Sequence, residues 1–152
     1  MKLSNKKMTI GFANDHTGVA LKHLLMQHCQ SKGYACLDVG TDSTQSVDYP
    51  DFAHALATAV LTHKVDIGFA FCGTGNGVAI TLNKHPHIRA GLCWNATIAQ
   101  LIKQHNNANV CVIPARFVTE QQAVAIADAY LDTVFEGGRH QTRIDKIDIG
   151  IK

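Results

Sequence analysis

The sequence predicts an α/β fold in which a mostly parallel sheet is covered by helices on both faces. Short apolar runs, such as Met-Thr-Ile-Gly-Phe-Ala at 8–13, alternate with longer segments whose apolar residues recur at helical spacing. Turn signals such as Gly40-Thr41-Asp42 separate them. No linker, repeat or low-complexity segment interrupts this alternation. We therefore expect residues 1–152 to form one domain, with 1–7 as a flexible start.

Each element has its own signal. Pro50 suits the first turn of a helix, because proline lacks only an amide that is unpaired there. Thr119 is a good N-cap, and Gln122 stands at the capping-box position of the same helix, which Gly137-Gly138 then stops. The expected strands are 8–13, 34–39, 66–71, 88–93 and 109–113. The expected helices are 19–29, 50–63, one after 72–77, 95–104, 119–134 and 139–148.

Composition excludes several classes of function. The net charge is +2, and no run of Lys or Arg is longer than Lys6-Lys7, so nothing indicates a nucleic-acid or anionic-membrane partner. No apolar stretch indicates a signal peptide or a membrane span. The five cysteines are scattered and odd in number, which favours reduced thiols in the cytoplasm over a disulfide framework.

A parallel sheet also predicts where a ligand binds. Ligands of such sheets lie outside the carboxyl ends of the strands, near a switch in strand order. Three segments are expected at that edge: Asn14-Asp15-His16, Cys72 to Gly77, and the stretch after the fourth strand that ends at His105-Asn106.

Cys72-Gly73-Thr74-Gly75-Asn76-Gly77 is the most informative segment. Its glycines allow a tight turn that leaves successive amides free to bind a negative charge. A thiol at that place should exist partly as thiolate, and Thr74 could donate a hydrogen bond to an oxygen that gains charge. The alternatives are a purely structural turn and a buried apolar cysteine. The segment is neither a dinucleotide-binding fingerprint nor a P-loop.

Other polar residues permit two interpretations each. His105 stands at a helix end, where it is either a functional imidazole or a C-cap. Asp15 is either a ligand-binding carboxylate or an N-cap. Arg139 and Arg143 share a helix face, where they either clamp a phosphate or form a solvated basic face. His85-Pro86-His87 lacks a third ligand nearby, so the sequence predicts no metal site.

Together and in this order, these pieces resemble the type B ribose-5-phosphate isomerases and their relatives, the galactose- and allose-6-phosphate isomerases. The resemblance covers about 8–147. It is carried by Asp15-His16, Asp48-Tyr49-Pro50, Cys72 to Gly77, Asn83-Lys84, Gln104-His105-Asn106, Arg116 and Glu136-Gly137-Gly138-Arg139-His140-Gln141-Thr142-Arg143.

The resemblance implies a Rossmann-like, five-stranded parallel sheet and a cofactor-free aldose–ketose isomerase of the pentose phosphate pathway. It further implies a homodimer or dimer of dimers whose sites are shared, with the C-terminal helix packing on a neighbouring subunit. It assigns the base to Cys72, enediolate binding to Thr74 and the amides of 73–77, and ring opening to His105. Sugar-lining residues would be Asp15, Tyr49 and Asn106; phosphate-side residues would be His16, Arg116, Arg139 and Arg143, with His140 beside them. Gly73, Gly75, Asn76 and Gly77 complete the expected binding loop.

The sequence departs from the family pattern at a few positions. Val78 stands where some members carry a glutamate base, so the thiol version applies here. Asn14 replaces a common Cys or Ser, and Trp94 is a large change near the sugar, which leaves a hexose 6-phosphate as an alternative substrate. A catalytically silent sugar-phosphate-binding module and a nucleotide-dependent oxidoreductase are the two alternative classes. The first is disfavoured by Cys72 and His105, and the second by the missing fingerprint.

Overall fold

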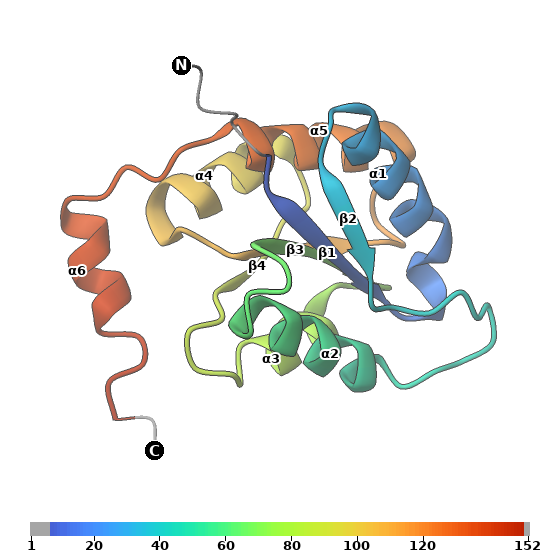
Figure 1. Ribbon diagram of the computed structural model, residues 1–152, viewed down its shortest axis with the longest axis horizontal. Coiled ribbons are helices and arrows are strands. Elements are labelled where there is room, and N and C mark those ends of the chain that lie inside the picture. Colours follow the sequence, from blue (N-terminus) through green and yellow to red (C-terminus); the bar gives the residue numbers. More distant parts are fainter. Residues whose placement is uncertain (1–6, 151–152) are drawn as a thin grey trace.

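The computed structural model describes residues 7–150, and it contains a five-stranded, wholly parallel sheet with helices on both faces (Figure 1). Residues 1–6 of the expected flexible start lie outside the described part. The strand order is β2-β1-β3-β5-β4. The strands are β1 (Thr9–Asn14), β2 (Ala35–Asp38), β3 (Ile67–Cys72), β4 (Ala90–Leu92) and β5 (Val110–Pro114). The Rossmann-like fold predicted from the sequence is confirmed.

The helices divide into two layers, as Figure 1 shows: α1, α4 and α5 cover one face of the sheet, and α2 and α3 cover the other. A short 3-10 helix, η1 (His16–Gly18), precedes α1. The helices are α1 (Val19–Ser31), α2 (Tyr49–Leu61), α3 (Asn76–Leu82), α4 (Ala96–Asn106), α5 (Glu120–Asp132) and α6 (Arg139–Asp145). The expected elements are all present, with boundaries shifted by a few residues. None of the helices within 7–150 is both long and apolar enough to span a bilayer.

Alternation along β3 decides which side chains reach which layer. Phe69 and Phe71 point into the core beneath α1, α4 and α5, whereas Ala70 and Cys72 point into the core beneath α2 and α3. All six residues of β3 are buried. Gly68 lets α2 approach closely, since a Cβ there would lie 2.9 Å from Leu56 Cδ1. The central strand is therefore fixed from both sides.

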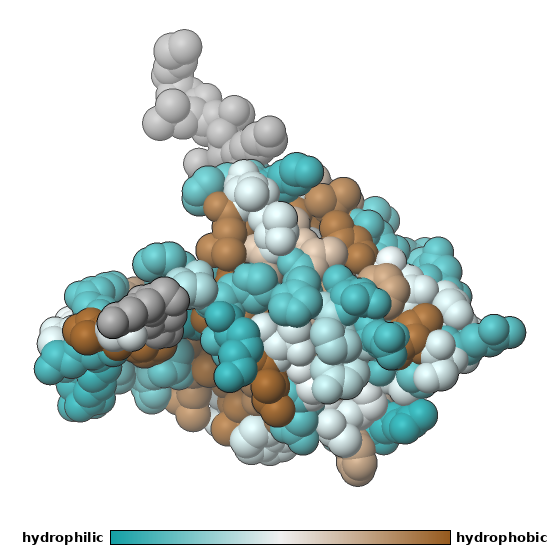
Figure 2. Space-filling model, turned by 90° about the horizontal axis from the view of Figure 1, so that it is seen from below, coloured by the Kyte–Doolittle hydropathy of each residue, from teal (hydrophilic) through white to brown (hydrophobic). Residues whose placement is uncertain are grey.

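The C-terminal arm, which we define as residues 133–150, differs from the rest of the fold. Figure 1 shows α6 standing away from the sheet, beside the end of α4, and α4 is the main element it contacts. His140 is the buried residue of this helix. Figure 2 shows hydrophobic residues gathered next to this projecting segment, on the side of the molecule covered by α2 and α3. Exposed apolar side chains include Ile80, Val134 and Ile147.

Candidate active site

The loop after β3 has the turn that its glycines predict. Gly75 adopts a left-handed conformation, with φ of +79°, and caps α3. A Cβ at Gly75 would lie 2.3 Å from Leu92 Cδ1, so a larger residue does not fit there. The Cys72 carbonyl accepts a hydrogen bond from the amide of Ala115, at 2.9 Å, and the Gly73 carbonyl accepts one from Arg116, at 3.0 Å. The loop is thus tied to the segment that follows β5.

The amides of this loop remain available to a ligand. Within residues 7–150, no acceptor is found for the amides of Thr74, Gly75 and Gly77. The Thr74 hydroxyl accepts a hydrogen bond from the Asn76 amide, at 3.2 Å. Because that contact uses the oxygen as acceptor, the hydroxyl hydrogen of Thr74 is free to donate to another group. Thr74 and Asn76 are exposed, so donors of this loop face solvent.

Two side chains flank the loop. A Cβ placed on Gly77 would lie 2.6 Å from the ring of Tyr49, so this ring rests directly against the start of α3. A Cβ on Gly73 would lie 3.3 Å from Cδ of Arg116, which places that side chain over the other end of the loop. The structure therefore brings an aromatic ring and a guanidinium to the carboxyl ends of the strands, where Cys72 also lies.

Asp15 lies at the same edge and acts as an N-cap, as one of its two interpretations predicted. Its Oδ1 accepts hydrogen bonds from the amide of Thr17, at 2.9 Å, and from its hydroxyl, at 2.6 Å. Its own amide donates to the carbonyl of Phe71, at 3.0 Å, next to Cys72. Nδ1 of the neighbouring His16 accepts from the amide of Val47, at 3.3 Å.

Two buried polar residues lie behind this edge: Asn14, which the sequence placed there, and Lys22, to which sequence reasoning gave no role. The Asn14 side chain donates to the Thr41 carbonyl, at 2.9 Å, and accepts from the Thr41 amide, at 3.1 Å. The fully buried Lys22 ammonium donates to the same carbonyl, at 2.7 Å, and pairs with Asp38 and Asp42, both at 3.0 Å. The hydrogen bond from Lys22 is the main cause that lowers the pKa of Asp42. Through these bonds to Thr41, Asn14 and Lys22 hold the loop between β2 and α2, which leads to Tyr49.

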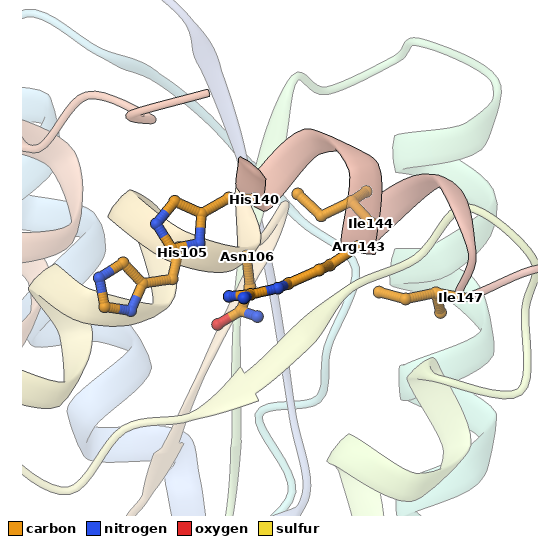
Figure 3. Close-up of a pocket in the computed structure, with 6 residues that line it drawn as sticks. All are labelled: His105, Asn106, His140, Arg143, Ile144 and Ile147. Carbon is orange, nitrogen blue, oxygen red and sulfur yellow. The ribbon is translucent and has the colours of Figure 1, made fainter. Parts of the chain in front are cut away.

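A second cluster surrounds a cavity of about 390 Å³ beside the C-terminal arm (Figure 3). His105 at the end of α4 stacks on His140 of α6, with ring centroids 4.5 Å apart. Arg143 reaches the same cavity from α6. Arg139 occupies the first position of α6 and is exposed. The cavity is lined by His105, Asn106, His140, Arg143, Ile144 and Ile147.

Glu136 belongs to this second cluster, and sequence reasoning gave it no role of its own. Its Oε2 lies 3.3 Å from Nε2 of His140, and its amide donates to the Gln104 carbonyl, at 3.1 Å. His105, Glu136 and His140 together form a group with the ligand types of a metal site. Glu136 and His140 are four residues apart, but His105 lies far from both along the chain, so the sequence does not reveal the group. Only the fold brings them together.

The two clusters lie at opposite ends of the strands, so the prediction that the segment ending at His105-Asn106 lies at the carboxyl ends is wrong. Cys72 pairs with Pro114 at the carboxyl end of β5. His105 and Asn106 end α4, which runs back across the sheet to the amino end of β5. There the guanidinium of Arg89, the residue just before β4, donates a hydrogen bond to the Asn106 carbonyl. The five residues of β5 span about 13 Å at 3.3 Å per residue. His105 therefore does not join Cys72 within one chain.

Cys72 itself is nearly closed off in the single chain. The residue is 4% exposed. The neighbouring Thr74 is exposed and Gly73 is partly so. A nearly covered thiol therefore lies next to an exposed hydroxyl.

Near His105, burial lowers the pKa of Lys103, and the positive charge of Arg89 lowers it further. The ammonium of Lys103 also lies 5.2 Å from the centre of the Tyr130 ring, over its face. Such a contact stabilises a partly desolvated cation. Lys103 therefore serves the packing of α4 on α5, rather than adding an exposed charge beside His105.

Comparisons with known proteins agree over nearly the whole chain. The sequence model of a family described as Ribose/Galactose Isomerase matches residues 10–147. Ribose-5-phosphate isomerase B of Escherichia coli is 43% identical over 138 residues, which cover 91% of this chain and 93% of that protein. The crystal structure of a ribose 5-phosphate isomerase from Thermotoga maritima has a TM-score of 0.90 at 42% identity, and the match covers 93% of this chain and 97% of that one. Ribose-5-phosphate isomerase B from Mycoplasma genitalium, solved with bound ribulose-5-phosphate, has a TM-score of 0.88 at 42% identity, with 91% and 93% covered.

Proposed function

Because the chain belongs to the ribose/galactose isomerase family, we propose that it interconverts ribose 5-phosphate and ribulose 5-phosphate, with Cys72 as the base. The chain is a sugar-phosphate isomerase by its family. The observation that carries the finer assignment is the Cys72 loop, where a thiol stands beside free amides and the Thr74 hydroxyl. In solution, we propose a cytoplasmic enzyme that consists of one domain, residues 1–152.

The proposed chemistry needs one proton to move between adjacent carbons. With ribose 5-phosphate as substrate, the Cys72 thiolate removes the proton from C2, and the electron pair of that C–H bond forms the C1–C2 double bond of an enediolate. The carbonyl oxygen on C1 takes up the negative charge, which the loop amides and Thr74 stabilise. The thiol then returns its proton to C1, and the oxygen on C2 becomes the carbonyl of ribulose 5-phosphate. One proton moves between the oxygens, so atoms and charge balance.

We further propose a homodimer in which each site combines the Cys72 edge of one copy with His105, Asn106 and α6 of the other. Two observations support this. The two clusters lie at opposite ends of the strands of one sheet. The C-terminal arm extends away from its own body, with Arg139 and Arg143 on its helix. Those arginines would hold the phosphate, and His105 would open the sugar ring.

Mixed dimers test the chemistry and the sharing of sites together. Cys72→Ala and His105→Ala should each lower turnover by at least about 10²-fold, because each removes a proton-transfer group. A heterodimer of the two variants, isolated with two different affinity tags, carries one intact site and one doubly defective site. It should therefore recover about half of the wild-type turnover per dimer.

An inactive heterodimer would contradict shared sites, because sites confined to one chain would each keep one defect. A fully active Cys72→Ala homodimer would instead overturn the assignment of the base. Cys36→Ser, at a partly exposed thiol on the edge strand, is the matched control and should keep wild-type turnover.

A panel of kcat/KM values for pentose and hexose phosphates measures which sugar the enzyme prefers. Trp94, which follows β4 and is 53% exposed, is the residue expected to affect that preference.

A further inference from the structure

We propose that His105, Glu136 and His140 form a binding site for a divalent transition-metal ion such as Zn²⁺. The nearest ligand atoms of these residues all lie within 4.8 Å of one another. Two imidazole nitrogens and one carboxylate oxygen, with a fourth position left open, are a ligand set that zinc takes in catalytic sites. Figure 3 shows the two rings next to each other, one carried by α4 and the other by α6.

The backbone around these residues holds them in place. The amide of Glu136 is bonded to the Gln104 carbonyl, so the residue before His105 anchors the loop that carries the carboxylate. Gly137 and Gly138 have φ of +70° and +58°, and they turn the chain so that His140 comes back toward His105. The amide of His140 donates to the Gly137 carbonyl, at 3.2 Å. These backbone contacts keep the three side chains within reach of one ion.

The geometry requires a small contraction. Ligand atoms about 2.1 Å from one tetrahedral ion lie roughly 3.4 Å apart, so the cluster has to close by somewhat more than 1 Å. The rings are nearly parallel, with 13° between their planes, and at least one has to rotate for both nitrogens to face one ion. Room exists for this, because His105 borders the cavity and the Glu136 side chain is 51% exposed.

The surroundings predict the fourth ligand. The cavity beside His105 is about 390 Å³ and also receives the guanidinium of Arg143. A positive charge there disfavours a cation alone but favours a cation that carries an anion. We therefore expect a water molecule or a small anion, such as phosphate, on the open position, close to Arg143.

Metal binding would inhibit the enzyme, and this consequence rests on the proposed function. An ion bound to His105 occupies an imidazole nitrogen that ring opening requires, and it also occupies His140 beside the phosphate-side arginines. Binding of the ion itself does not depend on any activity. The two statements are therefore measured separately.

The binding experiment uses Co²⁺, whose visible absorption reports a tetrahedral site, and then Zn²⁺ by displacement and calorimetry. One saturable ion per chain is expected for the wild-type protein. Glu136→Gln removes the anionic ligand and should weaken binding at least about tenfold. His54→Gln is the matched control, because His54 forms the other close imidazole pair, with His85 at 2.7 Å, and it should leave binding unchanged.

Several outcomes overturn the site. They are no saturable ion, equal affinity in the wild type and Glu136→Gln, or loss of binding in His54→Gln. A thiolate charge-transfer band in the Co²⁺ spectrum would also overturn it, since that band places the ion on a cysteine.

Turnover provides the second measurement. Zn²⁺ should inhibit the wild-type enzyme reversibly, and a chelator should restore full turnover. Inhibition is expressed relative to the metal-free turnover of each protein, and Glu136→Gln should need at least about tenfold more Zn²⁺ than the wild type for half inhibition. Inhibition that is equal in both proteins refutes the inference. Absence of metal-free turnover on every sugar phosphate refutes the proposed function instead, while the binding result still stands.

Discussion

The Cys72 loop and the C-terminal arm are held to the fold in opposite ways. The loop continues a strand whose six residues are all buried, and hydrogen bonds tie it to the segment after β5. The arm packs mainly on α4, and one residue of its helix, His140, is buried. Segments with few buried contacts open at a lower free energy than core strands. The Cys72 thiol thus lies on the rigid part, and Arg139 and Arg143 lie on the adaptable part.

This contrast suits the proposed division of labour. Moving a proton between two carbons requires donors fixed within fractions of an ångström, whereas holding a phosphate tolerates more freedom. A segment that extends from its own body is also able to reach a second copy. The difference between the two regions therefore predicts different kinetic signatures for substitutions in each.

Between the two regions, the larger effect is expected at the rigid loop. Thr74→Ala removes a donor aimed at the oxygen that gains charge, which should cost about 3 kcal/mol and lower kcat about 100-fold. The free energy of unfolding should change little, because Thr74 is exposed. Steady-state kinetics and urea unfolding measure both quantities. Thr74→Ser keeps the hydroxyl and serves as control; near-normal turnover of Thr74→Ala would contradict the assigned role.

Much of the fold was predictable because local signals agreed with one another. Thr119 and Gln122 form the capping box that their spacing predicted, with both hydrogen bonds present. Pro50 lies in the first turn of α2. The buried run that ends at Cys72 became the central strand, because continuous apolar strands are typical of parallel sheets.

The position of His105 was not predictable from the same signals. The segment after the fourth strand does begin at the carboxyl edge, but α4 carries its far end across the sheet to the amino edge. Linear order alone does not reveal this, whereas helix length does: eleven residues rise about 16 Å at 1.5 Å per residue. The buried Lys22 was missed because its partners, Asp38 at the end of β2 and Thr41 in the following loop, show no spacing that marks them as partners.

The buried interactions of Lys22 give the next prediction. Lys22→Met keeps most of the unbranched side chain but removes the hydrogen bond to Thr41 and the ion pair with Asp38, which should lower the free energy of unfolding by about 2 kcal/mol. Lys32→Met is the matched control. Because the Lys32–Asp128 pair is about one-third exposed, its loss should cost less than about 1 kcal/mol. Urea unfolding compares the two, and equal losses would show that the buried network adds nothing.

The smallest expected effect belongs to the arm and separates the two regions most directly. Arg139→Ala should raise KM about tenfold with kcat nearly unchanged, because a phosphate is held equally in the ground and transition states. Lys146→Ala removes another cation just after α6 and should change neither constant by more than about twofold. A fall in kcat for Arg139→Ala equal to that of Thr74→Ala would mean that the arm takes part in the proton transfer itself. The rigid loop and the arm would then act as one unit, and the proposed separation between chemistry and phosphate binding would be wrong.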